Sequence, residues 1–302
     1  MRTLVILNPA AGYGRGRAWR DRIVRGLSAQ GWQIDLVETS SPGDATTLAR
    51  EAAREGWARV VAAGGDGTVH EVANGLLTVP PDPDGASPSA LGVIPIGTGN
   101  DFARLLRLRP DVPERTALRL AGGRSSCFDV GRVAGEYFIN AVGAGFTAEV
   151  VRRVNAAGHL RGQLRYLTAA CATFARFRPP TFEVTALEFV ERGPMMLAEV
   201  AVGRSGGGGF LFTPDADPTD GKLDVCVVRQ VGPMGFLAKL PRVMRGTHGT
   251  LKEVALFTTR SVRIRSVGGP LHLHLDGEFR APDEQEITVS LEPGRLRVLI
   301  AA

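Results

Sequence analysis

The feature of this sequence that most constrains its fold is a repeated alternation of short apolar segments, small-residue loops and helical segments. Within one helical segment, Val69, Val72, Ala73 and Leu76 recur at i, i+3, i+4 and i+7, so one helix face is apolar. Such alternation is typical of a parallel α/β sheet, whose ligands bind beyond the carboxyl ends of the strands. We expect strands at residues 3–7, 33–37, 59–63 and 91–96, helices at 19–28, 44–55 and 69–76, and a proline-rich surface loop at 79–89.

The pattern changes near Cys127, where closely spaced β-type segments replace the alternation. Residues 128–133 and 137–142 are joined by Ala134-Gly135-Glu136, a spacing that indicates a hairpin. We therefore expect an α/β domain over residues 1–125, completed by 292–302, and a mainly antiparallel β-rich domain over 126–291. Further strands are expected at residues 181–189, 198–202, 223–228, 261–264, 271–275 and 286–291, and helical insertions at 148–176 and 233–245.

Composition limits the class of protein. The 302 residues are 44% hydrophobic and 22% charged, which is typical of a soluble globular protein. No apolar run reaches the ~18 residues of a membrane-spanning helix, and Asn8 ends the first apolar segment too early for a signal peptide. Three distant cysteines, Cys127, Cys171 and Cys226, form neither a zinc-ribbon nor a disulfide pattern and fit a reducing cytosol.

Positive charge is concentrated near the N-terminus. The net charge is +5, and six arginines in the first 34 residues face only Asp21. A field of this sign attracts phosphate groups, nucleic acid or an anionic membrane surface. The six are Arg2, Arg15, Arg17, Arg20, Arg22 and Arg25.

The segment Gly64-Gly65-Asp66-Gly67-Thr68 lies between a predicted strand and a predicted helix. Bare backbone can approach a phosphate there, and the amides of the helix point toward it. Asp66 suits this place if it holds hydrated Mg²⁺ or orients a phosphate-bound ligand. The alternative is a glycine-rich turn in which the aspartate caps the helix.

Two further loops occupy the same kind of position. Residues 8–14 follow the first predicted strand, and residues 95–104 follow the fourth. Three small, polar loops are therefore expected at one edge of the sheet. None contains the Gly-Lys-Ser/Thr of a Walker A loop or a Gly-x-Gly-x-x-Gly dinucleotide fingerprint, so the predicted phosphate site is of another type.

With these motifs, the sequence resembles the diacylglycerol-kinase catalytic family, the bacterial lipid kinases grouped with sphingosine and ceramide kinases. The resemblance runs nearly end to end. Its marks, in order, are Asn8-Pro9 with Gly12 and Gly14, Gly64 to Thr68, Gly97-Thr98-Gly99-Asn100-Asp101-Phe102-Ala103, Gly206 to Pro214, Asp220-Gly221-Lys222-Leu223-Asp224-Val225, and Leu275-Asp276-Gly277-Glu278. Two places depart from the family pattern: Gly203-Arg204 replaces a frequent Asn-Gly pair, and Lys222 replaces a common apolar residue.

The resemblance implies an ATP- and Mg²⁺-dependent kinase of lipid hydroxyls. It implies an NAD-kinase-like α/β domain followed by a β-rich sandwich domain, with the active site in the cleft between them. It implies a structural Mg²⁺ on Asp220, helped by the backbone carbonyls of Asp217 and Lys222. The implied nucleotide contacts are Asn8, Thr39, Gly64, Gly65, Asp66, Gly67, Thr68, Val69, His70, Gly97, Thr98 and Asn100, with Ser40 and Ser41 competing for the place of Thr39.

Phosphoryl transfer needs a base that takes the proton of the acceptor hydroxyl. Asp276 and Glu278 flank a glycine at the end of a predicted strand. In the family that this chain resembles, the glutamate of this motif is the proton acceptor, so Glu278 is the predicted base and Asp276 the alternative. His272 and His274 share one face of the strand, and we interpret them as packing or surface residues rather than metal ligands.

Two segments combine arginine with apolar residues. Residues 152–178 interleave Arg161, Arg165, Arg176 and Arg178 with leucine and phenylalanine, and residues 236–245 repeat this pattern on a smaller scale. Such segments suit peripheral contact with anionic lipid headgroups. A helix with one core-facing side and one solvated basic side explains the first segment equally well.

Two rival functions remain open. NAD kinase shares the Gly-Gly-Asp-Gly-Thr loop and the two-domain plan, but the segment Gly97 to Phe102 favours the lipid-kinase branch. A non-catalytic nucleotide- or lipid-binding module is the second rival. Nucleic-acid binding is not expected, because aromatic residues interleaved on a basic sheet are absent from the sequence. We expect a cytoplasmic protein that associates peripherally with the membrane when it acts on lipid, and homodimerisation stays open.

Overall fold

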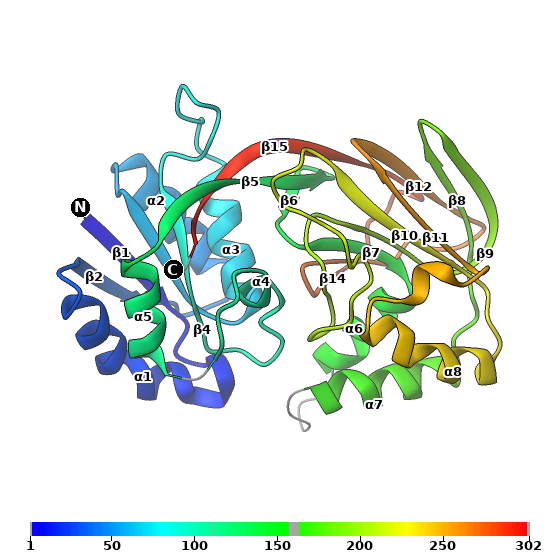
Figure 1. Ribbon diagram of the computed structural model, residues 1–302, viewed down its shortest axis with the longest axis horizontal. Coiled ribbons are helices and arrows are strands. Elements are labelled where there is room, and N and C mark those ends of the chain that lie inside the picture. The colour runs from blue at the N-terminus through cyan, green and yellow to red at the C-terminus, as the bar shows by residue number, and fades with distance from the viewer. Residues whose placement is uncertain (1, 111, 157–162, 301–302) are drawn as a thin grey trace. The chain divides into compact units, whose positions relative to one another are not determined.

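The computed structural model describes residues 2–110, 112–156 and 163–300 and divides the chain into two compact units (Figure 1). The first unit comprises Met1–Val130 and Pro293–Ala302, and the second comprises Gly131–Glu292. Strands β5 (Arg124–Val133) and β15 (Glu286–Ile300) contribute residues to both units. Among the described residues, no helix is long and apolar enough to cross a membrane.

A parallel sheet forms the centre of the first unit, in the order β15-β4-β3-β1-β2. Its strands are β1 (Arg2–Leu7), β2 (Gln33–Glu38), β3 (Arg59–Gly64) and β4 (Ala90–Pro95), with the end of β15. Val5, Val61 and Ile94 are fully buried and pack with Ile23 and Leu27 of the first helix. The predicted parallel α/β part of the fold is thus confirmed.

Five helices accompany this sheet among the described residues; one begins earlier than predicted, and two, at Asp101–Leu105 and Pro113–Ala121, were not predicted. They are α1 (Ala11–Ser28), α2 (Asp44–Arg54), α3 (Asp66–Leu77), α4 (Asp101–Leu105) and α5 (Pro113–Ala121). Helix α1 begins well before residue 19, with a kink at Gly12, Tyr13 and Gly14, which all have positive φ. Helix α5 was not predicted, although its buried Thr116, Ala117 and Leu120 lie on one face.

Two antiparallel sheets that share β9 (Phe189–Ala201) form the second unit, which confirms the predicted β-rich part. Residues 189–194 of β9 pair with β8, whereas residues 195–201 pair with β10 and β7. The predicted strand at 181–189 is in fact the hairpin of β8 and β9. The other strands are β6 (Glu136–Phe138), β7 (Ala141–Gly145), β8 (Thr181–Ala186), β10 (Leu223–Arg229), β11 (Val254–Thr259), β12 (Ser261–Val267), β13 (Leu273–Leu275) and β14 (Glu278–Arg280).

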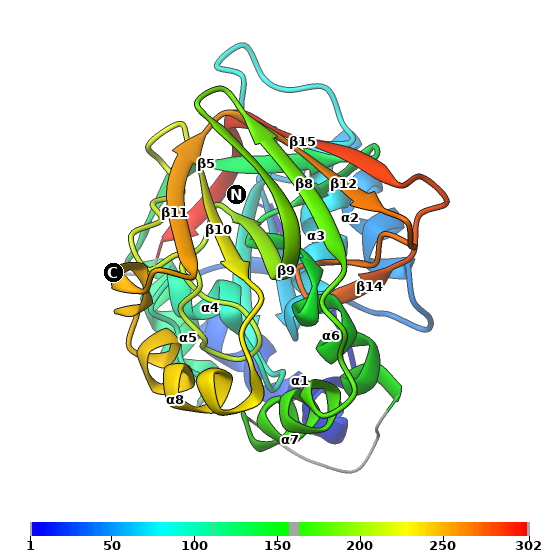
Figure 2. The ribbon, with the colours of Figure 1, turned by 90° about the vertical axis from the view of Figure 1, so that its right-hand side faces the viewer.

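The helical insertions of the second unit gather at one end of its strands (Figure 2). They are α6 (Phe146–Ala156), α7 (Gln163–Phe174), α8 (Pro233–Met244) and the short η1 (His248–Thr250). Phe146, Val150 and Val154 of α6 pack with Met196 and Leu197 of β9 in an apolar cluster. The first insertion is therefore a core-covering pair of helices over its described part.

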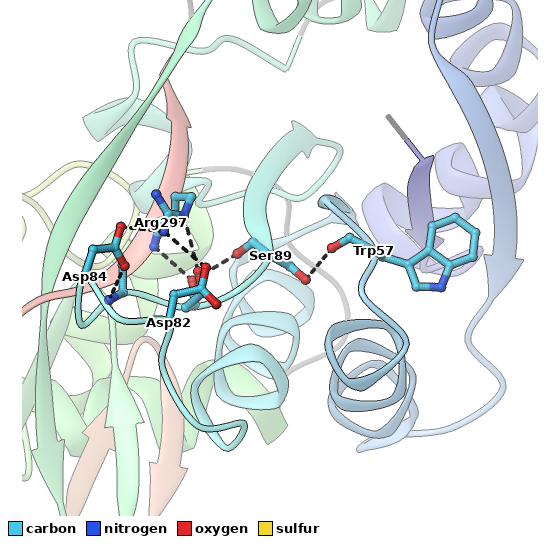
Figure 3. Close-up of polar contacts among 7 residues, drawn as sticks. Trp57, Asp82, Asp84, Ser89 and Arg297 are labelled. Atoms are coloured by element: carbon cyan, nitrogen blue, oxygen red, sulfur yellow. Dashed lines mark hydrogen bonds and ion pairs between the residues drawn. The ribbon is translucent and has the colours of Figure 1, made fainter.

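The proline-rich segment 79–89 is only partly a surface loop. Ser87 and Ser89 are fully buried, and the Ser89 hydroxyl donates a hydrogen bond to the carbonyl oxygen of Trp57 (Figure 3). Arg297 of β15 pairs with Asp84 at 2.8 Å and with Asp82 at 3.5 Å. The ion pairs of Arg297 therefore hold this segment against strand β15 within the first unit.

Arg295 of β15 caps the end of α3. Its Nη2 donates hydrogen bonds to the carbonyl oxygens of Leu77 and Val79, both at 3.0 Å. The last carbonyls of a helix lack intrahelical partners, and a cation near them also interacts favourably with the helix dipole. Arg295 thus satisfies backbone groups in a part-buried place where water competes poorly.

We expect Arg295→Met to lower the free energy of unfolding by about 1–3 kcal/mol, because it leaves part-buried carbonyls without their donor. Denaturant titration followed by circular dichroism measures this change. Arg265→Met, at an exposed position on β12, is the matched control and should change stability by less than about 0.5 kcal/mol. Equal effects of the two substitutions would contradict the capping role.

Candidate active site

The three loops predicted to bind phosphate meet at the carboxyl ends of β1, β3 and β4. The Asn8 amide donates a hydrogen bond to the Thr68 hydroxyl at 3.1 Å. The N–H groups of Ile96 and Gly97 donate to the carbonyl oxygen of Gly64 at 2.8 and 3.2 Å. Residues from the loops after all three strands therefore form one site within the first unit.

Glycine is required where these loops touch. A Cβ atom on Gly97 would lie 2.5 Å from the Cα of Gly65, and one on Gly64 would lie 2.4 Å from the Thr68 hydroxyl oxygen. Both distances are shorter than real Cβ contacts. The loops therefore present bare backbone, as a phosphate-binding surface needs.

Arg15 ties the first loop to the third. Its Nη2 donates a hydrogen bond to the carbonyl oxygen of Ile96 at 2.9 Å, and its Nε donates to that of Gly12. Gly12 has φ +60, and a Cβ there would lie 2.3 Å from the same Ile96 oxygen. Sequence reasoning counted Arg15 only as charge and missed this contact.

Asp66 lies beside Asp101, a second carboxylate that was not assigned a role from the sequence. Part of Asp66 is exposed, but desolvation of its carboxyl group and repulsion from Asp101 raise its pKa to about 7, although N–H groups of Asn100, Asp101 and Phe102 donate to it. Gly99 lies next to both carboxyl groups, because a Cβ there would lie 2.7 Å from an Asp66 oxygen and 3.6 Å from an Asp101 oxygen. Two carboxyl groups thus lie close together among the loops predicted to bind phosphate.

Thr98 and Asn100 belong to the same loop. The buried Asn100 has φ +52, and its amide donates to the carbonyl oxygen of Gly97 at 2.8 Å. Thr98 stays partly exposed. Asn100 therefore shapes the loop around the buried Gly97, while Thr98 remains within reach of a ligand.

Asp44 distinguishes Ser40 and Ser41 from Thr39, the three candidates for one predicted nucleotide contact. The Ser40 and Ser41 hydroxyls and N–H groups all donate to Asp44, and these bonds lower the pKa of Asp44 to about 2. Thr39 lies at the carboxyl end of β2, and its N–H bonds to the carbonyl oxygen of Leu7. Thr39 keeps its hydroxyl outside the Asp44 network and remains the better candidate.

Val69 and His70 are less suited to touch a nucleotide than Gly65 or Thr68. Both side chains are buried, and the Val69 N–H already bonds to the carbonyl oxygen of Gly65. His70 interacts with Asn74 one turn further along α3. These positions support the helix behind the Gly64-to-Thr68 loop.

In the second unit, Asp276 and Gly277 form a two-residue hairpin loop between β13 and β14. Their φ values of +48 and +90 match the turn that Asp-Gly favours between antiparallel strands, and Leu275 pairs with Glu278 across it. Asp276 accepts hydrogen bonds from the N–H groups of Ile139, Asn140 and Ala141 at 2.9 to 3.0 Å. Asp276 is therefore committed to holding the turn against the segment before β7.

Glu278 is half-buried at the start of β14. Its neighbour Arg280 pairs with Glu136 at 2.6 Å. The Glu136 hydrogen bond, with smaller contributions from the charges of Glu278 and Asp276, raises the pKa of Arg280. A cation thus stays close to the two acids of the turn.

His272 and His274 each pair with a carboxylate. His272 contacts Glu149 of α6 at 2.5 Å, and His274 contacts the buried Glu199 of β9 at 3.2 Å. The Thr147 hydroxyl donates to Glu199 as well, at 3.0 Å. The interpretation as packing residues holds for the buried His274, but both histidines also connect the strand before Asp276 to neighbouring elements.

The turn that holds Asp217, Asp220 and Lys222 is ordered by its own hydrogen bonds. Asp217 accepts from the N–H and hydroxyl of Thr219, and Asp220 accepts from the N–H of Lys222. Desolvation, then the charges of Asp220 and Asp215, raise the pKa of Asp224 to about 6. Among the described residues, no three His, Cys, Asp or Glu side chains are grouped to hold a metal, so a metal ion on Asp220, as the sequence predicts, would need backbone carbonyls as further ligands.

Only some of the arginines predicted to face the membrane lie among the described residues. Arg161 lies outside the described residues, as does Leu160. In the described part, Arg176 and Arg178 follow α7. The contact with lipid headgroups therefore stays a prediction.

The first part of the chain, residues 2–133, matches the diacylglycerol kinase catalytic domain, and residues 140–300 match the YegS C-terminal NAD kinase beta sandwich-like domain. A diacylglycerol kinase of Bacillus subtilis is 31% identical over 280 residues, which cover 92% of this chain and 90% of that protein. A crystal structure of a diacylglycerol kinase from Bacillus anthracis has a TM-score of 0.74 at 22% identity, covering 99% of this chain and 96% of that one.

A more distant structural likeness is to an NAD kinase from Archaeoglobus fulgidus in complex with ATP. Its TM-score is 0.56 at 13% identity, covering 99% of this chain and 93% of that one, so it supports the fold alone. The family matches together cover nearly the whole described chain, and the Bacillus subtilis relative confirms them over the same span. The chain therefore belongs to the family of lipid kinases that carry the diacylglycerol kinase catalytic domain.

Proposed function

We propose that this protein transfers the γ-phosphate of ATP to the hydroxyl group of a diacylglycerol-like lipid. The observation that carries the proposal is the Asp66–Asp101 pair, which lies where three phosphate-type loops meet. Kinase reactions place a negatively charged polyphosphate and its metal ion at such a site. The names of the relatives supply the lipid class, since the Bacillus subtilis protein is a diacylglycerol kinase.

The residues of the first unit fit Mg²⁺. Desolvation and the repulsion between the Asp66 and Asp101 carboxylates raise the pKa of Asp66, and a divalent cation would reduce this repulsion. Mg²⁺ is usually held by one or two carboxylates together with substrate phosphates. Bound there, the ion would neutralise charge on the migrating phosphoryl group. Asp66 and Asp101 would hold it, while Gly65, Gly97 and Thr98 would border the phosphates.

For the acceptor side we propose Glu278 as the base. A carboxylate that acts as the base must direct one of its oxygens toward the substrate hydroxyl. Asp276 already receives three backbone N–H bonds, so its oxygens are directed into the protein. Glu278 follows Gly277, which has no side chain, and keeps part of its surface exposed, which suits contact with a headgroup.

Transfer of radiolabelled γ-phosphate to a panel of diacylglycerol, sphingoid base, phosphatidylglycerol and NAD tests the proposal. We expect label in a lipid with a free hydroxyl. Label in NAD alone would replace the proposal by the NAD kinase reaction, and label in none of the acceptors, with ATP bound, would favour a non-catalytic module.

We expect Asp66→Asn to lower turnover by roughly three powers of ten or more, because it removes a ligand of the proposed Mg²⁺. The protein should stay folded, as measured by circular dichroism. Asp21→Asn, at an exposed position on α1, is the control and should leave turnover unchanged. Near-normal turnover of the Asp66 variant would refute the assignment.

The same substitution should raise stability at alkaline pH. An unfolded aspartate ionises near pH 3.8, whereas folded Asp66 holds its proton until about pH 7. The folded state therefore loses stability as the pH rises between these values, and the loss persists above pH 7. In metal-free buffer, Asp66→Asn should melt a few degrees above the unmodified protein at pH 8 and at the same temperature near pH 4. A constant difference across this range would contradict the raised pKa.

We expect Glu278→Gln to lower kcat by roughly two to four powers of ten while ATP affinity persists, because general-base catalysis contributes about that much. The acidic limb of the pH–rate profile should disappear. Asp276→Asn should instead lower thermal stability and keep the limb, because Asp276 orders the turn. A limb that survives in Glu278→Gln and vanishes in Asp276→Asn would reverse the assignment.

The proposed structural Mg²⁺ on Asp220 is tested without nucleotide. In the Asp66→Asn background, which lacks the other proposed site, Mg²⁺ should still raise the melting temperature by a few degrees. Adding Asp220→Ala should remove this rise, whereas adding Asp283→Ala, at an exposed position, should not. Absence of any Mg²⁺ effect in the Asp66 variant would exclude this second site.

A further inference from the structure

A pocket in the first unit, just after α4, shares Asn100 with the predicted nucleotide contacts, and its other lining residues have no role in the proposed reaction. It has a volume of about 380 Å³ and is lined by Asn100, Arg104, Arg107, Leu108, Arg109 and Pro110. This size falls in the range of small-molecule sites, which combine apolar walls with a few polar groups. Here the apolar wall is Leu108 with Pro110, and the polar groups are three guanidinium groups and an amide.

The three guanidinium groups lack a matching negative charge. Among the residues that the structure describes, no carboxylate pairs with Arg104, Arg107 or Arg109. Arg104 donates a hydrogen bond to the carbonyl oxygen of Gly99 at 3.2 Å, which holds it at the wall of the pocket. Like charges gathered in a concave place raise the local concentration of anions.

The backbone around Arg107 is fixed and strained. The N–H of Arg107 donates a hydrogen bond to the carbonyl oxygen of Arg104, and the N–H of Leu108 donates one to that of Ala103. This pair of hydrogen bonds is typical of a helix that ends in a left-handed residue. That residue is Arg107, with φ +56, at a place where glycine is the ordinary choice. A long cationic side chain kept in a conformation that costs about 1 kcal/mol is an observation that points to a function at this position.

We propose that this pocket is an anion site for a phosphomonoester, separate from the proposed nucleotide site. Arginine offers a planar fork that matches phosphate oxygens, and a pocket larger than a phosphate ion leaves room for the group that carries it against Leu108 and Pro110. A phospholipid headgroup and a free soluble phosphate ester present the same chemistry. The test has one arm for each of these two sources.

The first arm uses the full chain, saturated with Mg²⁺ and a non-hydrolysable ATP analogue, and titrates glycerol 3-phosphate by calorimetry. The variant is Arg107→Gln with Arg109→Gln, and the control removes two exposed arginines from β12, Arg263→Gln with Arg265→Gln. We expect affinity for glycerol 3-phosphate to fall roughly tenfold or more in the variant and to persist in the control. Affinity for the ATP analogue should be the same in all three proteins.

The second arm measures sedimentation with vesicles of phosphatidylcholine, with or without phosphatidic acid. Binding that requires phosphatidic acid, is lost in the variant and is displaced by glycerol 3-phosphate identifies the lipid headgroup as the source. Binding of glycerol 3-phosphate without any effect of the variant on vesicles identifies the soluble ester.

Arg107→Gly separates a lost ligand contact from a lost fold. Glycine relieves the left-handed strain, so this variant should melt at or above the temperature of the unmodified protein and yet bind glycerol 3-phosphate more weakly. Unchanged binding in both Arg107 variants would overturn the proposal. A parallel loss of ATP-analogue affinity would overturn it too, because the pocket would then be part of the nucleotide site. No turnover is measured, so a failed kinase assay leaves this result intact.

Discussion

The contact between Gly65 and Gly97 is the constraint on which the candidate site depends. Because neither residue has a side chain, the loop after β4 approaches the loop after β3 closely enough for two N–H groups to reach the carbonyl oxygen of Gly64. The same approach places Asp101 beside Asp66, and their repulsion, added to desolvation, raises the pKa of Asp66 to about 7. The first unit therefore carries an arrangement that is unfavourable for the protein alone, and the proposed Mg²⁺ would reduce the repulsion between the two carboxylates. Such a conflict between local stability and chemistry is expected at functional sites.

The second unit separates structural and chemical duties between two acids of one turn. Asp276 holds the turn by accepting hydrogen bonds from three backbone N–H groups, so we expect its removal to shift the turn and the strands on either side of it. Glu278 then extends from a hairpin whose geometry is already fixed. The strand that leads to the turn is itself held by His274 against the buried Glu199 and by His272 against Glu149. The proposed base thus follows a turn whose position is held by these contacts, and general-base catalysis requires a positioned base.

The sequence predicts the strands of the first unit well because each is a short apolar run that ends in a small-residue loop, as at Gly64 and Gly97. It fails at particular side-chain contacts and turns, some between distant residues and some local. Asp101 is visible in its motif, but only the fold shows that it lies beside Asp66. Asp44 is an ordinary helix residue in the sequence, yet it takes the hydroxyls of Ser40 and Ser41 and leaves Thr39 as the candidate. The segment at 181–189 reads as one strand because its hairpin turn contains neither glycine nor proline.

The arginines show why a count of charge predicts less than their placement. The N-terminal field expected from the sequence is compensated in part: Arg22 pairs with Glu114 and Arg20 with Glu38, while Arg2 lies over the ring of Trp57. Other arginines, such as Arg15 and Arg295, are used to bind backbone carbonyls. A guanidinium group that binds carbonyl oxygens keeps its positive charge, but some of its donors are already used. Arg104, Arg107 and Arg109 line one pocket and have no matching carboxylate among the described residues, so the proposed anion site is assigned to that pocket and not to α1.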